Sequence, residues 1–174
     1  MPKFSKLLEN VYRAVNIGLV NELKILTDKL NLNIHEIINA ASTKPFGFVP
    51  FYPGPGLGGH CIPIDPYYLS WKAENVGIKT RFIKLAGEIN SSIPKIIVKK
   101  IKNIFNKSKK RNNKILVLGV TYKKNINDLR ESPGIKILDL LKKNKFKVSY
   151  SDPFIPKIPK LRNYNLNLKS VKVT

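Results

Sequence analysis

One stretch of the chain, residues 51–66, limits what the rest can form more than any other feature. It reads Phe-Tyr-Pro-Gly-Pro-Gly-Leu-Gly-Gly-His-Cys-Ile-Pro-Ile-Asp-Pro. Prolines and glycines at this density interrupt helices and strands, so the stretch predicts an ordered loop between two helices. The loop holds the only cysteine, Cys61, with His60 before it and Asp65 four residues after it. A thiol with a carboxylate close behind it suits covalent catalysis.

Composition sets the class of protein. The 174 residues, 43% of them hydrophobic, can form one ordinary domain or two small ones with a buried core. A single cysteine excludes an intramolecular disulfide and fits a reducing compartment. The sequence has no apolar run of about 18–20 residues and no signal-peptide pattern, so we expect a cytoplasmic protein with no membrane partner.

The net charge of +21 permits binding to nucleic acid. The basic stretches 99–102 and 109–111, however, lie on or directly after an amphipathic segment. We interpret them as solvated helix surface, and no specific nucleic-acid partner is expected because basic and aromatic residues do not cluster in stripes. The charge is also compatible with a small substrate that carries phosphate.

Apolar residues recur at helical spacing from Phe4 to Leu30 and predict one long helix, a typical spine or dimer interface. Lys6 and Asn10 lie four residues apart and share one face of it, either as solvated groups or as a functional pair. Asn33 and Glu36 predict a capped helix to Ala41.

Further helices are expected on both sides of a proline. Asp65 followed by Pro66 is typical of an N-cap and a first helical residue, with the helix ending before Gly77. A helix over 81–90 is then followed by another that Pro94 restarts and that reaches residue 105. The polar, basic residues 106–113 are the expected domain linker.

The pattern changes after this linker. A buried strand is expected over 114–119, a helix from Ser132 to Asn144 and a second strand over 147–150. Strand, helix and strand predict a parallel βαβ unit. The expected fold is a mainly α dimerisation domain over 1–106, followed by the first part of an α/β Rossmann-like domain with a parallel sheet over 113–174.

Two motifs are ambiguous from the residues alone. Gly54, Gly56 and Gly59 match G-x-G-x-x-G, but no strand precedes them and no helix follows at once, so we reject a nicotinamide-binding turn. Cys61 alone could be a nucleophile or a small buried hydrophobe. Two histidines and one cysteine make a zinc site unexpected.

The loop after Gly119 follows the first strand, at the edge where such folds bind ligands. It carries Tyr122, Lys123, Lys124 and Arg130, which suit the stacking of a base and the binding of phosphates. The alternative is an ordinary solvated basic loop.

Four segments in order, residues 6–17, 56–66, 118–124 and 128–132, resemble the nucleotide-sugar dehydrogenases, the UDP-glucose/GDP-mannose dehydrogenase family. The sequence His60-Cys-Ile-Pro-Ile-Asp-Pro66, with Thr43-Lys-Pro-Phe-Gly47 before it, is most similar to the UDP-N-acetylglucosamine 6-dehydrogenase branch. The resemblance covers essentially the whole chain.

The resemblance implies a four-electron, NAD-dependent oxidation of the C6 alcohol of a UDP-sugar, for the synthesis of polysaccharide precursors. Cys61 would form a thiohemiacetal with the intermediate aldehyde and then a thioester, which water hydrolyses. Lys6 would stabilise the developing negative charge or move a proton, and Asn10 would hydrogen-bond the same oxygen or a water. Asp65 would orient that water or the lysine.

The resemblance also implies binding roles. Tyr52 and the backbone at the glycines of the loop would pass close to the sugar, and Tyr122 and Lys123 would bind the uridine diphosphate. Arg130 would reach the NAD cofactor. The glycines concerned are Gly56, Gly58 and Gly59.

Full members of the family carry a further, N-terminal NAD-binding domain, which this sequence does not contain. We therefore expect NAD to be bound mainly outside the chain, and no NAD-dependent turnover by the 174 residues alone. The expected partners are a UDP-sugar, further copies of the chain in a homodimer or higher oligomer formed through the long N-terminal helix, and a separate NAD-binding half. The alternatives are a non-catalytic dimerisation and UDP-sugar-binding fragment or split-gene half and, more remotely, a basic nucleic-acid binder.

Overall fold

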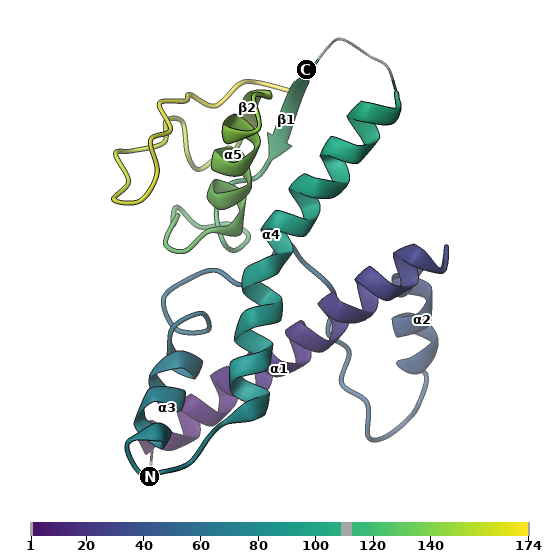
Figure 1. Cartoon of the computed structure of the whole chain (residues 1–174), viewed down its shortest axis with the longest axis vertical. Helices are drawn as coiled ribbons and strands as arrows, with labels where there is room; N and C mark the ends of the chain where they lie inside the picture. Colours follow the sequence, from purple (N-terminus) through teal and green to yellow (C-terminus); the bar gives the residue numbers. More distant parts are fainter. Residues whose placement is uncertain (1, 109–112, 174) are drawn as a thin grey trace. The chain divides into compact units, whose positions relative to one another are not determined.

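The structure, a computed structural model, describes residues 2–108 and 113–173. Five helices and two strands follow one another in these residues (Figure 1). They divide into two compact units. The helical unit comprises the residues up to Gly56 and Cys61–Ser91, and the sheet unit comprises Leu57–His60 and the residues from Ser92 onward. Residues 109–112 of the expected linker lie outside the described residues.

The helical unit is built around α1 (Pro2–Lys29), and the predicted long helix is confirmed. Both α2 (Ile34–Ala41) and α3 (Asp65–Glu74) contact α1. The predicted cap of α2 is also confirmed, because the side-chain oxygen of Asn33 accepts a hydrogen bond from the backbone N–H of His35 at 3.0 Å.

Helix α4 spans Arg81–Lys107, and a buried pair of amides joins its first part to α1. Asn21 Nδ2 donates to Asn90 Oδ1 at 3.0 Å, and Asn90 Nδ2 donates to the carbonyl oxygens of Ala14 and Ala86 at 2.9 Å each. Asn21 Oδ1 in turn accepts from the N–H of Gly54 at 2.9 Å. These bonds fix the start of the Pro-Gly loop to two helices.

Two of the expected helix boundaries are wrong. The N-cap of α3 is Ile64, which makes no side-chain cap bond, and Asp65 is the first helical residue. Its carboxylate has instead a partner on α1, Asn10. In α4, Pro94 lies inside one continuous helix where two helices were expected. Pro94 and its neighbour Ile93 are buried, and this packing offsets the backbone hydrogen bond that proline cannot make.

The sheet unit confirms the predicted βαβ arrangement. Strands β1 (Lys114–Leu118) and β2 (Lys147–Ser151) pair in parallel, with α5 (Pro133–Lys143) between them in the chain. Ser132 caps α5 by accepting from the N–H of Gly134 at 3.2 Å, and its hydroxyl donates to the carbonyl of Val120 at 2.6 Å. The capping serine thus fixes the chain directly after β1 as well.

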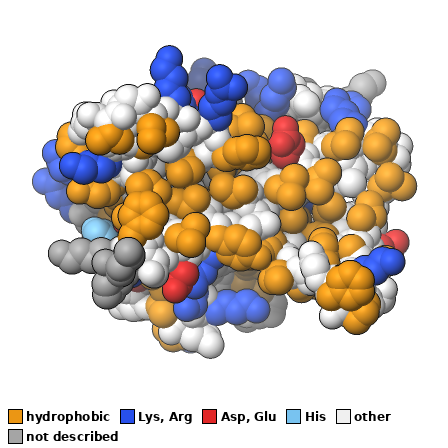
Figure 2. All heavy atoms as spheres, turned by 90° about the horizontal axis from the view of Figure 1, so that it is seen from below, with side chains coloured by type: hydrophobic (Ala, Val, Ile, Leu, Met, Phe, Trp, Pro, Cys, Tyr) orange, Lys and Arg blue, Asp and Glu red, His pale blue; other side chains and the backbone are white. Residues whose placement is uncertain are grey.

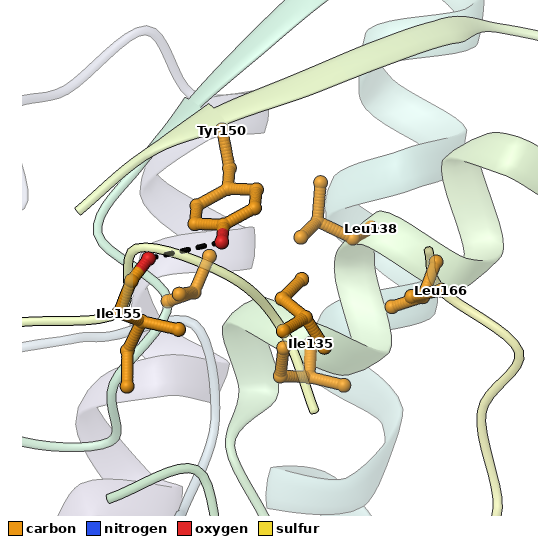
Figure 3. Packing of buried hydrophobic residues seen from close by; sticks show 7 residues of the cluster. Ile135, Leu138, Tyr150, Ile155 and Leu166 are labelled. Carbon is orange, nitrogen blue, oxygen red and sulfur yellow. Dashed lines mark hydrogen bonds between the residues drawn. The ribbon is translucent and has the colours of Figure 1, made fainter. Parts of the chain in front are cut away.

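The core of this unit lies between β2, α5 and the C-terminal segment (Figure 3). Tyr150 from β2 is fully buried, and its hydroxyl donates to the carbonyl of Ile155 at 2.9 Å. Burial raises the pKa of the Tyr150 phenol above its ordinary value of 10.0. A second cluster joins Val98 of α4 to Ile137 and Leu141 of α5.

Large apolar side chains also lie at the surface, and Figure 2 shows one face on which hydrophobic groups gather. On α1 and at the residue directly after it they form a stripe of residues that are 37–61% exposed: Phe4, Leu8, Tyr12, Leu19, Leu23, Leu26 and Leu30. A continuous exposed apolar stripe on one helix is typical of an interaction surface. In the part of the chain that the structure describes, no helix has the length and apolar character needed to cross a membrane.

Candidate active site and nucleotide-binding loop

Two of the candidate catalytic residues meet within the helical unit. Asn10 of α1 is buried, and its Nδ2 donates to Oδ2 of Asp65 in α3 at 2.7 Å. The two residues are 55 positions apart in the sequence, so the fold and not the local pattern joins them. Lys6 is exposed one turn earlier on α1.

Cys61 is tied to the same carboxylate residue through the backbone. The carbonyl oxygen of Cys61 accepts from the N–H of Asp65 at 2.8 Å and from that of Ile64 at 3.1 Å. The thiol is half-buried and free of any disulfide. Asn10, Asp65 and the peptide of Cys61 therefore form one hydrogen-bonded group.

The sequence did not single out Arg13, which orients Asn10. Arg13 Nη1 donates to Oδ1 of Asn10 at 3.2 Å, while Nη2 lies 3.6 Å from a carboxylate oxygen of Glu9. Because the arginine occupies the amide oxygen, the amide nitrogen faces Asp65. The spacing of Arg13, three residues after Asn10 on the same helix, is the signal that could have indicated it.

Tyr52 lies in the helical unit, where two residues of α2 hold its side chain in one orientation. Its hydroxyl donates to Oδ1 of Asn39 at 3.1 Å, and its ring stacks on that of His35 with the centroids 5.9 Å apart. Gly56, with φ of +125°, closes this part of the loop. The expected contact of Tyr52 and Gly56 with the sugar stays a prediction.

In the sheet unit, a buried aspartate organises the loop after β1. Asp152 follows β2, and its Oδ2 accepts from the N–H groups of Val120 at 2.8 Å and Thr121 at 3.4 Å. The sequence analysis did not assign this residue. An aspartate directly after the second of two parallel strands is the available signal, because the strand ends lie at one edge.

Tyr122 and Lys123 lie in that loop. Lys123 is exposed, and its carbonyl accepts from the hydroxyl of Thr121 at 3.0 Å. Tyr122 is partly buried against Gly58 and Gly59, which belong to the same unit. These two glycines were expected beside a sugar, and the structure places them on the tyrosine.

Arg130 is engaged by a neighbouring carboxylate. Its Nε and Nη2 donate to Oδ2 of Asp128 at 2.9 and 2.6 Å, and its backbone N–H donates to Oδ1 at 2.9 Å. The hydrogen bonds from Arg130 hold the pKa of Asp128 below its ordinary value of 3.8. The expected role of Arg130 toward NAD stays a prediction.

Comparison with protein families identifies the chain. The family model "UDP-glucose/GDP-mannose dehydrogenase family, central domain" matches residues 3–92, and the model "UDP-glucose/GDP-mannose dehydrogenase family, UDP binding domain" matches residues 116–173. The chain belongs to the UDP-glucose/GDP-mannose dehydrogenase family. The matched domains account for both groups of residues described above.

Individual curated and solved proteins are similar to the chain in sequence and in structure. A UDP-N-acetyl-D-mannosamine dehydrogenase of Methanocaldococcus jannaschii is 41% identical over 86% of the chain and 33% of its own length. A UDP-N-acetyl-D-glucosamine 6-dehydrogenase of Salmonella typhi is 35% identical over 93% of the chain and 38% of its own length. The structure of the UDP-N-acetyl-mannosamine dehydrogenase Cap5O from Staphylococcus aureus superposes with a TM-score of 0.74, at 39% identity over 87% of this chain and 35% of that one. The chain thus spans about a third of the length of these relatives.

The described residues do not fit the dinucleotide turn of a dehydrogenase. No strand leads into the glycines at 54, 56 and 59, and α3 begins only at Asp65. Gly59 packs on Tyr122, where a dinucleotide turn would need open backbone for the pyrophosphate. Within residues 2–108 and 113–173, no group of three or more His, Cys, Asp and Glu side chains could hold a metal ion.

Proposed function

We propose that the chain supplies the thiol-bearing and UDP-binding parts of an NAD-dependent dehydrogenase. Its substrate would be a UDP-N-acetylhexosamine, whose C6 alcohol is oxidised to the carboxylic acid. The observation that carries the proposal is the hydrogen bond of 2.7 Å between Asn10 and Asp65, together with the backbone bond from Asp65 to Cys61. Family membership and the names of the relatives support the substrate class.

In this proposal Cys61 is the nucleophile toward the C6 aldehyde. The Cys61 thiol gives up its proton as the sulfur bonds to the carbonyl carbon, the π electrons move to oxygen, and the oxygen takes up a proton, which gives a thiohemiacetal. Lys6 provides positive charge near that oxygen. An amide nitrogen carries two N–H groups, so Asn10 can donate to Asp65 and to the oxygen at once.

Asp65 has two proposed roles in the reaction, one in each of two steps. Its Oδ2 fixes Asn10, and its carboxylate can orient a water for hydrolysis of the thioester. NAD would supply the oxidising power, and no step is assigned to it here because the described residues do not form its binding turn.

UDP would be held by the sheet unit. Tyr122 and Lys123 follow β1 on a loop whose start, at Val120, is hydrogen-bonded to Asp152 and Ser132. A lysine at this edge suits a diphosphate, because its ammonium group is a compact positive charge with three donors. The exposed side chain of Lys123 is available for this contact.

A second copy of the chain would cover the apolar stripe on α1. Leu19, Leu23, Leu26 and Leu30 follow one another at spacings of four, three and four residues, the pattern of a seam between two helices. Their side chains are 37–57% exposed, so a partner helix would remove substantial apolar surface from water.

The proposed chemistry can be tested without the oxidation step. The chain is mixed with the C6-aldehyde form of UDP-N-acetylglucosamine or of UDP-N-acetylmannosamine, labelled with ¹³C at C6. We expect the carbon-13 spectrum to show a carbon bonded to both oxygen and sulfur, and Cys61→Ala to abolish that signal. UDP added in excess should also remove it. A spectrum that is the same for the wild type and for Cys61→Ala would refute Cys61 as the nucleophile.

The same samples address the main alternative, a UDP-sugar-binding module that performs no chemistry. Such a module binds the labelled nucleotide and forms no bond to sulfur. The epimer that gives the stronger sulfur-bound signal identifies the preferred N-acetylhexosamine. Restored production of NADH on mixing with a separate NAD-binding half would support the complete reaction.

A further inference from the structure

The four residues before Cys61 pack with the sheet unit and not with the helical unit in which Cys61 itself lies. Leu57–His60 belong to the sheet unit. The N–H of Gly59 donates to the carbonyl of Arg130 at 2.9 Å, so a backbone hydrogen bond holds this short segment. The peptide that leads into the thiol is therefore fixed by the loop after β1.

The segment approaches Tyr122 more closely than a side chain would allow. A Cβ at Gly58 would lie 2.5 Å from Cβ of Tyr122 and 3.0 Å from Cδ of Pro133. A Cβ at Gly59 would lie 2.8 Å from Cε2 of the Tyr122 ring. Gly59 also has φ of +89°, which side chains disfavour. Both positions require glycine because the tyrosine fills the space beside them.

Tyr122 is in turn fixed by its own loop. Its N–H donates to the carbonyl of Asp128 at 3.3 Å, and the carboxylate of Asp128 holds the guanidinium and the N–H of Arg130. The residue that carries the ring and the residue that accepts from Gly59 are thus parts of one closed turn. This turn holds the glycine segment in place, and we call the contact of Tyr122 with Gly58 and Gly59 the seat.

We infer that Tyr122 is a positioning residue for Cys61: its Cβ seats Gly58, its ring seats Gly59, and together they fix the backbone directly before the thiol. This role rests on the proposed function and differs from the contact with uridine that the family resemblance implies. A ligand that moves the loop carrying Tyr122 also moves the peptide that precedes Cys61. The loop after β1 then acts on the segment before the thiol through Gly58 and Gly59, which belong to the same unit as the loop.

The test uses the reactivity of Cys61, the only thiol of the chain. The rate of alkylation by iodoacetamide is measured against pH for the wild type, Tyr122→Ala and Tyr122→Phe. We expect Tyr122→Ala to raise the rate about tenfold, since loss of the seat allows the segment to open. Tyr122→Phe should keep the wild-type rate, because the contacts use ring atoms and Cβ. Equal rates for Tyr122→Ala and the wild type would overturn the inference.

A control separates a local effect from loss of stability in the sheet unit. Tyr150→Phe removes a buried hydrogen bond of the same unit, far along the chain from the glycine segment. We expect it to leave the alkylation rate of Cys61 unchanged. If Tyr150→Phe accelerates alkylation as much as Tyr122→Ala does, the effect reflects general destabilisation and the positioning role is wrong.

A measurement on the unmutated chain covers the case in which Tyr122→Ala does not fold. Proton NMR should show a nuclear Overhauser effect between the α protons of Gly59 and the ring protons of Tyr122, and its absence contradicts the seat. Gly59→Ala should open the segment to hydrogen exchange much more than Gly77→Ala opens its own turn. Gly77 has a similar φ of +78° and no atom within 4 Å of the position that a Cβ would take. Gly77→Ala therefore introduces the backbone strain of a positive φ without a steric clash.

None of these readouts involves a sugar or NAD. A failed aldehyde adduct with an intact Tyr122 effect would refute the proposed function and keep the seat. An intact adduct with no effect of Tyr122→Ala on alkylation would keep the proposed function and refute the positioning role of Tyr122.

Discussion

Replacement of Asn90 by alanine tests the buried amide pair that joins α1 to α4. Asn90 is 3% exposed and takes part in three side-chain hydrogen bonds, with Asn21, Ala14 and Ala86. Each such bond contributes about 1 kcal/mol to stability. The substitution also leaves the amide nitrogen of Asn21 without its acceptor in a buried site. We therefore expect the free energy of unfolding of the helical unit to fall by about 3 kcal/mol or more.

The matched control is Asn16→Ala on α1, the other helix of the pair. Asn16 Nδ2 donates to the carbonyl of Tyr12 at 2.8 Å, a local bond at the exposed surface of α1. Water can replace such a bond, so the expected change is within about 0.5 kcal/mol. Comparison of the two variants removes the effect of helix propensity, which both share.

Urea unfolding followed by tryptophan fluorescence is the appropriate assay. Trp71 is the only tryptophan and lies in α3, so the signal reports the helical unit separately from the sheet unit. Two units need not unfold in one transition, and a probe confined to one of them avoids that assumption. A loss of stability for Asn90→Ala within about 1 kcal/mol of that for Asn16→Ala would show that the amide pair does not hold the unit together.

Two further substitutions test the sheet unit and the apolar stripe. Tyr150→Phe should cost about 1 kcal/mol at neutral pH, from the lost bond to Ile155. Because the folded pKa of Tyr150 is raised above 10.0, the wild type should lose stability as the pH rises from about 10 through the folded pKa. The variant should lose less over that range, as measured by urea midpoints from circular dichroism, and an identical decline would contradict the assignment. Leu19→Glu with Leu26→Glu should convert a dimer to a monomer in light scattering, whereas Ile104→Glu, an exposed apolar residue of α4 outside the stripe, should not.

Much of the fold follows from local patterns because its elements depend on local chemistry. The stripe of α1, the cap at Asn33 and the Ser132-Pro133 start of α5 each need only residues within a few positions. The parallel pairing of β1 with β2 follows from the helix between them. Such features are readable from a single sequence.

The errors arise where a distant residue changes what a local pattern would do. Asp65 has the sequence of an N-cap, yet its carboxylate accepts from Asn10 on α1. Pro94 has the sequence of a helix start, yet burial keeps α4 continuous through it. Arg13 is different, because its bond to Asn10 is local to α1 and only its spacing of three residues could have indicated it. Tertiary contacts decided the cases of Asp65 and Pro94.

The glycine loop shows a related limit. Gly58 and Gly59 indicate a close backbone approach, and the sequence analysis expected that approach beside a sugar. The structure places Tyr122 against both glycines, 63 residues beyond Gly59 in the printed chain, and their contact with a sugar stays a prediction. A glycine pattern reports that something lies close, and only the fold identifies what it is.

Hydrogen bonds hold the backbone on both sides of Cys61. On its C-terminal side the carbonyl of Cys61 is bonded to the N–H of Asp65, whose carboxylate meets Asn10 in the helical unit. On its N-terminal side the chain is bonded through Gly59 to the sheet unit. Because the residues on either side of Cys61 are held by these bonds, we expect substitutions at Asp65 and at Tyr122 each to alter the rate at which the Cys61 thiol is alkylated.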